Sequence, residues 1–185
     1  MEKSIIFSYT SNCKINLGLQ ILNKRNDNFH NLESIFVEVD LADTLNFKKT
    51  DNFVFTSNDK HLSKLENNTI ILAYQKLESL YVGNDSYSIH LEKRIPMGSG
   101  LGGGSSNAAT TLKALNSLWN LKLSDKKLIE IALSIGSDTP FFINGKNQYI
   151  EGKGDLLTPL LNLKLSQYYI LIIDSGIHVN TKHAY

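Results

Sequence analysis

The sequence has little cysteine and no excess of either charge. Its only cysteine, Cys13, excludes an internal disulfide framework and a zinc site built on several thiolates. With 19 Lys and Arg against 18 Asp and Glu, it lacks the charge that general attraction to nucleic acid or acidic membranes requires. It has no apolar run of about 18 residues and no secretory signal. We therefore expect a cytoplasmic protein without nucleic-acid or membrane partners.

The composition is that of a globular domain, with 42% apolar and 20% charged residues among 185. Hydrophobic periodicity predicts strands at 14–19, 34–39, 44–47, 53–55, 86–91, 141–143, 149–151 and 168–173. It predicts helices at 70–80, 108–118 and 125–135, with caps at Asn68-Thr69 and Ser124, and another helix beginning near residue 180. Strands and helices mix without a regular βαβ order, so the predicted class is α+β.

A glycine-rich segment precedes the second predicted helix. Five glycines lie between Gly98 and Gly104, and Ser105-Ser106 follow. Glycine allows a positive φ and close approach of a ligand, and a helix N-terminus offers unpaired N–H groups. This arrangement favours a phosphate cradle over the alternative, a flexible or tight loop without a ligand.

Two common phosphate motifs fit this segment poorly. Gly98-x-Gly100-x-x-Gly103 satisfies the dinucleotide fingerprint, and Asp125 follows at about the expected distance of twenty residues. However, the preceding segment 88–95 ends in charged residues, unlike a buried parallel strand. The P-loop pattern fails because Gly103 is followed by another glycine instead of lysine. Hydride transfer is therefore disfavoured.

Four ordered motifs carry a resemblance to a known family. Residues 96–106, Pro-Met-Gly-Ser-Gly-Leu-Gly-Gly-Gly-Ser-Ser, resemble the ATP-binding motif of the GHMP kinases. Residues 13–17, 25–30 and 136–142 resemble further motifs of one branch of that family, with Cys13 and Ser137 in place of alanine and Asn28-Phe29 in place of Gly-Tyr. The family's third motif, a C-terminal glycine-rich loop, has no counterpart in this sequence.

The resemblance implies a fold and a reaction. It implies a GHMP-kinase N-terminal lobe, a ribosomal-protein-like two-layer sandwich over residues 1–160, followed at 161–185 by the start of a truncated, ferredoxin-like lobe. The branch implies ATP- and Mg²⁺-dependent phosphorylation of the 2-hydroxyl of cytidine diphosphate methylerythritol, in non-mevalonate isoprenoid precursor biosynthesis. The resemblance implies that half of the substrate cleft lies outside this sequence, so we expect weak or absent turnover by the isolated chain.

The resemblance also assigns site residues. It makes Asp138 the catalytic aspartate and Lys14 its cationic partner, although Asp in such a turn is usually a cap and lysine on a strand is usually solvated. The implied substrate-binding residues are Asn16, Phe29, His30, Asp138 and Tyr185. The implied ATP-binding residues are Pro96, Met97, Gly98, Ser99, Gly100, Leu101, Gly102, Gly103, Gly104, Ser105 and Ser106, with one of the two serines helping to hold Mg²⁺.

Two other functions remain open from the sequence. One is a GHMP kinase acting on a different alcohol. The other is a nucleotide- or nucleic-acid-binding module without catalysis, including an inactive kinase lobe.

Lys153 and Asp155, in a turn that resembles the family's Gly-x-Gly-Glu, are expected to be structural.

Overall fold

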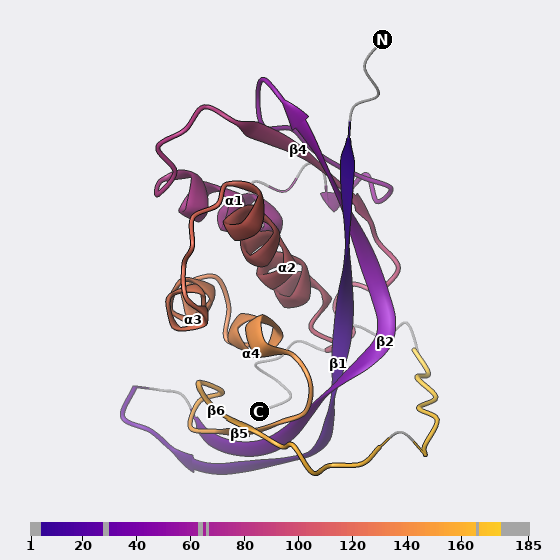
Figure 1. The fold of residues 1–185 in the computed structure, drawn as a ribbon. Helices are drawn as coiled ribbons and strands as arrows, with labels where there is room; N and C mark the ends of the chain where they lie inside the picture. The colour runs from indigo at the N-terminus through magenta and orange to yellow at the C-terminus, as the bar shows by residue number, and fades with distance from the viewer. Residues whose placement is uncertain (1–4, 28–29, 63–64, 66, 166, 175–185) are drawn as a thin grey trace.

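The computed structural model describes residues 5–27, 30–62, 65, 67–165 and 167–174. Two long strands come first, followed by a mixture of helices and short strands (Figure 1). The strands are β1 (Ile6–Lys24), β2 (His30–Thr50), β3 (Phe55–Ser57), β4 (Ser86–Glu92), β5 (Gln148–Glu151) and β6 (Leu156–Pro159). The helices are α1 (Thr69–Glu78), α2 (Gly103–Leu118), α3 (Asp125–Leu133) and α4 (Thr139–Asn144). The α+β class is confirmed.

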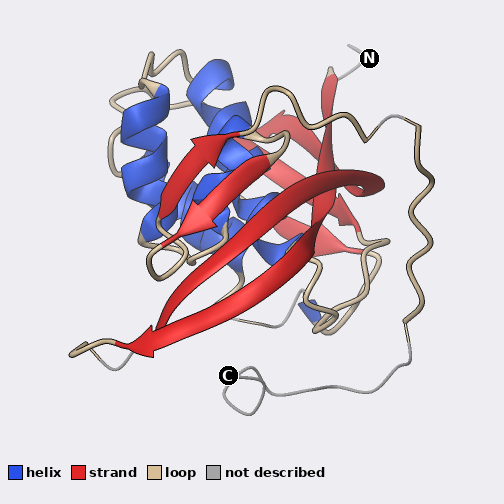
Figure 2. Ribbon diagram, turned by 90° about the horizontal axis from the view of Figure 1, so that it is seen from below, coloured by secondary structure: helices blue, strands red, loops and turns tan. Residues whose placement is uncertain are grey.

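The sheet is organised around β2. Its order is β3-β4-β2-β5-β6, and β1 pairs with β2 antiparallel from Ile6↔Lys48 to Lys24↔His30. Because β2 is long, β4 pairs with its C-terminal half and β5 with its N-terminal half. The strands predicted at 34–39 and 44–47 are thus parts of one strand, and the helices lie on one side of the bent β1–β2 pair (Figures 1 and 2).

The apolar residues of β2 are divided between two clusters. Phe36, Leu45 and Phe47 join the main core with residues of α1, α2 and α4. Val37 and Val39 point the other way, into a smaller cluster with Cys13, Ile95 and Leu101. Alternation explains why Phe36 and Val37 face opposite sides. Leu45 and Phe47 have the same parity as Val37 and Val39, and the change of face between them coincides with the register shift opposite Asn12 and Cys13. The smaller cluster lies where the glycine-rich segment meets the sheet.

The capping residues in the sequence correctly predicted where two helices begin. The Asn68 side chain accepts a hydrogen bond from Ile70 N, and the Ser124 side chain accepts one from Lys127 N. These are N-caps that satisfy otherwise unpaired backbone donors. The helix predicted from residue 108 begins earlier, at Gly103, so the last glycines of the segment belong to its first turn.

Two strand predictions are wrong. Residues 141–143 lie in α4, because a short apolar run does not distinguish strand from buried helix and Pro140 suits a first helical turn. Residues 168–173 form no strand and are mostly exposed, since this segment pairs with no strand of the described chain. The predicted domain boundary at 160/161 remains a prediction, and the helix predicted near residue 180 lies outside the described residues.

None of the helices in the described part of the chain is long and apolar enough to cross a membrane.

Candidate active site

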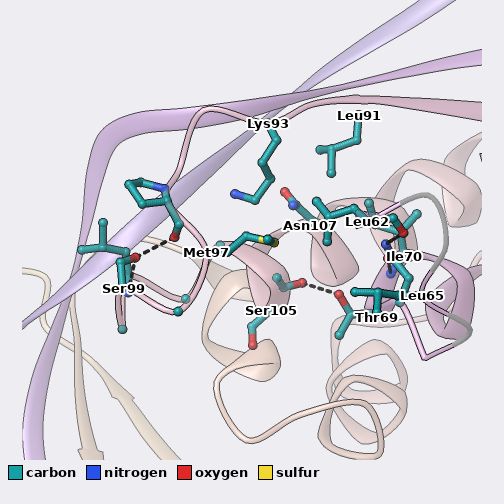
Figure 3. A pocket seen from close by; sticks show the side chains of 18 of the residues that line it. Leu62, Leu65, Thr69, Ile70, Leu91, Lys93, Met97, Ser99, Ser105 and Asn107 are labelled. Carbon is teal, nitrogen blue, oxygen red and sulfur yellow. Dashed lines mark hydrogen bonds between the residues drawn. The ribbon is translucent and has the colours of Figure 1, made fainter. Parts of the chain in front are cut away.

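The glycine-rich segment lines a cavity of about 390 Å³ (Figure 3). Every predicted ATP-binding residue from Pro96 to Ser105 lines this cavity. The opposite wall is more apolar and comes from α1, the segment before it and β4; it includes Leu62, Leu65, Ile70 and Leu91. Lys93 and Asn107 also line the cavity. The cavity therefore joins a polar, backbone-rich end to an apolar end.

The start of α2 has the geometry of an anion cradle. Gly102 is its N-cap with φ of 71°, and the first intrahelical bond runs from Ser106 N to Gly102 O at 2.9 Å. The amides of Gly103, Gly104 and Ser105 precede this bond, at the positive end of the helix dipole. The Thr69 hydroxyl donates to Gly104 O at 2.8 Å and ties α1 to the cradle.

Ser106 lies differently from Ser105. Its side chain is 2% exposed, and its hydroxyl bonds to that of Ser11 at 2.7 Å. It is absent from the residues that line the cavity, whereas Ser105 is among them. Of the two serines, only Ser105 therefore offers its hydroxyl to a ligand in the cavity.

Lys14 and Asp138 lie together next to this loop. Lys14 Nζ is 3.5 Å from Asp138 Oδ2, although the two residues come from β1 and the start of α4. Lys14 N donates to Leu101 O at 2.9 Å, which attaches the strand carrying this lysine to the glycine-rich segment. The structure thus brings a cation and an anion to the border of the cradle.

The backbone position of Asp138 leaves its carboxylate available. Asp138 is the N-cap residue of α4, but its side chain makes no capping hydrogen bond. The carboxylate instead faces Lys14 and lies 3.5 Å from the Ser137 hydroxyl. Its side chain is 33% exposed, so a solvent-borne hydroxyl can approach it. The turn-capping alternative for Asp138 is therefore wrong.

Lys14 is buried and held from several sides. The residue is 5% exposed, and its ammonium group lies 4.5 Å from the centre of the Phe36 ring. Nζ also donates to Asn16 Oδ1 at 2.8 Å. These contacts fix the ammonium group at one place, which excludes the alternative that Lys14 is a solvated strand residue.

Asn16 connects Lys14 to a residue that sequence reasoning missed. Asn16 Nδ2 donates to Ser34 Oγ at 3.0 Å, and the Ser34 hydroxyl donates to Gly18 O at 2.7 Å. This chain orients the Asn16 amide so that its oxygen faces Lys14. Strand alternation alone placed Ser34 among the residues of β2 without indicating this contact.

The remaining predicted substrate residues are only partly described. His30 is half-buried at the first position of β2, opposite Lys24 in the register. Phe29 and Tyr185 lie outside the described residues. A second cavity is lined by Ser137 and the turn Lys153–Asp155, so this turn lies near the residue that precedes Asp138.

Burial shifts two pKa values around the site. It raises the pKa of the Cys13 thiol, next to Lys14 in β1. It lowers the pKa of Lys113, whose ammonium group donates to Phe142 O in α4 at 2.8 Å. Lys113 thereby links α2 to the helix that begins at Asp138.

The described residues contain no group of three or more His, Cys, Asp or Glu side chains placed to hold a metal ion.

Comparison with known proteins shows what the chain resembles. Residues 68–146 match the model of the GHMP kinases N terminal domain. A relative from Thermodesulfovibrio yellowstonii, named 4-diphosphocytidyl-2-C-methyl-D-erythritol kinase, is 42% identical over 93% of this chain and 59% of its own length. One from Azobacteroides pseudotrichonymphae with the same name is 40% identical over 94% of this chain and 65% of its own length. The chain therefore spans about three fifths of the length of these relatives.

Solved structures show the same likeness. A crystal structure of 4-(cytidine 5'-diphospho)-2C-methyl-D-erythritol kinase is 35% identical, with a TM-score of 0.72, covering 83% of this chain and 55% of that one. The Methanococcus jannaschii mevalonate kinase, at 16% identity, has a TM-score of 0.62 over 86% of this chain and 56% of its own, and shows the shared fold alone. With the family match over α1 to α4, these findings show that this chain is similar to the GHMP kinases in fold and, over this part, in sequence.

Proposed function

We propose that this chain carries the ATP site and catalytic pair of a kinase that phosphorylates the 2-hydroxyl of 4-diphosphocytidyl-2-C-methyl-D-erythritol. The observation that carries the proposal is the Lys14–Asp138 pair at 3.5 Å, beside the glycine-rich segment to which Lys14 N is hydrogen-bonded. The names of relatives up to 42% identical support the choice of substrate. A different alcohol remains the alternative outcome of the substrate test below.

ATP fits the cavity at both ends. The amides of Gly103, Gly104 and Ser105 are placed to bind phosphate oxygens, and the apolar wall suits a base. A Cβ at Gly103 would lie 3.0 Å from Ile95 Cγ2, so the close approach of the backbone here depends on glycine. Mg²⁺ would arrive with ATP, with the Ser105 hydroxyl as a further ligand, and would neutralise charge on the phosphates.

Asp138 and Lys14 have different roles in the proposed phosphoryl transfer. In the proposal, Asp138 accepts the proton of the attacking hydroxyl, or orients that hydroxyl toward the γ-phosphorus. Lys14 stabilises the negative charge that develops on the attacking oxygen and the γ-phosphate. Because Lys14 is held by Asn16 and Phe36, little reorganisation is needed when the charge develops. His30 is proposed to bind the cytosine edge.

ADP release tests the proposal. The chain is assayed with ATP, Mg²⁺ and 4-diphosphocytidyl-2-C-methyl-D-erythritol, with homoserine, mevalonate and galactose as competing acceptors. We expect weak turnover by the unsubstituted chain, and Asp138→Ala and Lys14→Ala should each lower that turnover further, by about a hundredfold or more. The surface variants Asp51→Ala and Lys127→Ala are matched controls, since both residues are exposed and lie on other segments.

Nucleotide affinity is measured on the same variants by calorimetry. The proposal expects Asp138→Ala to bind ATP nearly as well as the unsubstituted chain, because this residue acts on the acceptor. Faster turnover with another alcohol would contradict the proposed substrate. Unchanged turnover in both Lys14→Ala and Asp138→Ala would contradict the catalytic pair.

A further inference from the structure

A fully buried carboxylate lies behind the wall of the nucleotide cavity. Asp43 of β2 is 0% exposed, and its Oδ1 accepts hydrogen bonds from Arg94 N at 2.7 Å and Ile95 N at 2.8 Å. Its Oδ2 accepts from Lys93 Nζ at 2.8 Å and from Asn107 Nδ2 at 3.0 Å. One carboxylate thus accepts from four donors, three in the segment between β4 and the glycine-rich loop and one in α2.

This contact determines which way the Asn107 amide faces. A carboxylate only accepts hydrogen bonds, so Asn107 must present its NH₂ group to Asp43. Among the described residues, the remaining oxygen, Asn107 Oδ1, is buried and has no hydrogen-bond partner, although the side chain lines the cavity. Figure 3 shows Asn107 between Lys93 and the apolar wall. An unpaired buried acceptor on a residue that lines a ligand cavity calls for an explanation, and a donor from the ligand is one.

The chemistry of the nucleotide indicates which donor this is. Phosphate oxygens are acceptors and cannot pair with Asn107 Oδ1, whereas the amino group of adenine is a donor. The apolar side chains Leu62, Ile70 and Leu91 line the same cavity and suit a flat base. The donor is therefore expected on the base.

We propose that Asp43 is a positioning residue for nucleotide selection. It turns the Asn107 amide so that Oδ1 accepts from the adenine amino group, and it holds the Lys93 ammonium group in the cavity wall, where Lys93 also donates to Ile95 O. The inference rests on the proposed function, because it takes the cavity to be a nucleotide site. It adds a specificity role for a residue that never touches the ligand.

Asp43→Asn tests this role directly. Its new NH₂ group either faces the NH₂ group of Asn107, or Asn107 turns over and offers Oδ1 to it. A turned Asn107 would present NH₂ to the base, which favours inosine triphosphate, because inosine carries a carbonyl oxygen where adenosine carries the amino group. Asp40→Asn is the matched control, since Asp40 lies three residues earlier on β2 and is exposed.

The measurement is the affinity of the 185-residue chain for ATP and inosine triphosphate, by calorimetry, with circular dichroism as the folding check. The unsubstituted chain and Asp40→Asn should prefer ATP by about tenfold, the size of one good hydrogen bond. Asp43→Asn should lose or reverse that preference, and Asn107→Ala should lose it. If Asp43 and Asn107 had a merely structural role, the substitutions would lower the affinity for both nucleotides equally.

The outcomes separate this inference from the proposed function. If Asp43→Asn does not fold, Asn107→Ala decides, because that variant leaves the Asp43 contacts to Lys93, Arg94 and Ile95 in place. A preference for ATP that persists in the folded variants, or that is absent from the unsubstituted chain, overturns the inference. Failure of the unsubstituted chain to bind either nucleotide overturns the proposed function, and the inference with it.

Discussion

Gly102→Ala tests whether the glycine-rich loop and the catalytic lysine are packed as one unit. Gly102 has φ of +71°, and a Cβ there would lie 3.0 Å from Phe142 Cζ and 3.2 Å from Lys14 Cγ. Gly100 has a similar φ of +76°, but a Cβ there meets nothing within 4 Å. Both substitutions therefore strain the backbone by placing alanine at a positive φ. Only Gly102→Ala also brings a Cβ against Phe142 and Lys14.

The expected magnitudes follow from this difference. A non-glycine residue in the left-handed region costs about 1–2 kcal/mol, which both variants should lose in free energy of unfolding. Overpacking adds about 1–3 kcal/mol for Gly102→Ala alone. The Phe142 ring has little room to move, because it is 4% exposed and packs edge-to-face on Phe141 at 4.9 Å between ring centres.

Urea unfolding followed by the fluorescence of Trp119, which is buried in the core, measures both free energies. Gly102→Ala should also lower ADP release more than Gly100→Ala, because the only way to relieve the contact is to move Phe142 or the stem of Lys14. Equal losses of stability in the two variants would refute the claim that the loop packs directly against Lys14.

Three further predictions follow from burial and capping. Cys13 is 0% exposed and burial raises its pKa, so the folded chain should react with a thiol reagent at pH 8 far more slowly than the urea-unfolded chain; equal rates would contradict its placement. Burial lowers the pKa of Lys113 below its ordinary 10.5. Between the lowered pKa and 10.5, the unfolded chain therefore binds more protons than the folded chain. The free energy of unfolding should therefore rise with pH from the lowered pKa toward 10.5, and Lys113→Met, compared by urea titration at each pH, should lack this component. Asn68→Ala removes the cap on Ile70 N and should cost about 1 kcal/mol in the same assay, whereas Asn67→Ala, at an exposed neighbour, should cost less.

Local features of the fold were predictable from the sequence. The caps Asn68 and Ser124 were identified because a cap depends on residues within one turn. The helix at 139–144 was predicted as a strand because Phe141-Phe142-Ile143 is too short to show a period. The strand predicted at 168–173 failed for a different reason, since a strand requires a partner that no local pattern can supply.

The site was predictable only as far as motifs extend. Resemblance to the GHMP kinases named Lys14 and Asp138, and the structure places them 3.5 Å apart. The resemblance assigned no role to Asp43, Ser34 or Asn107. Their contacts join β1, β2, the segment after β4 and α2, which are far apart in the sequence. No sequence signal singled out Asp43, which falls between the strands predicted at 34–39 and 44–47; the structure shows that this carboxylate is buried and held by donors.

The most direct test of the central claim is a crystal structure of the chain with a non-hydrolysable ATP analogue and Mg²⁺. The account predicts phosphates against the amides of Gly103–Ser105, with the γ-phosphate directed toward Lys14 and Asp138. A nucleotide bound elsewhere, or one whose γ-phosphate points away from this pair, would contradict the account.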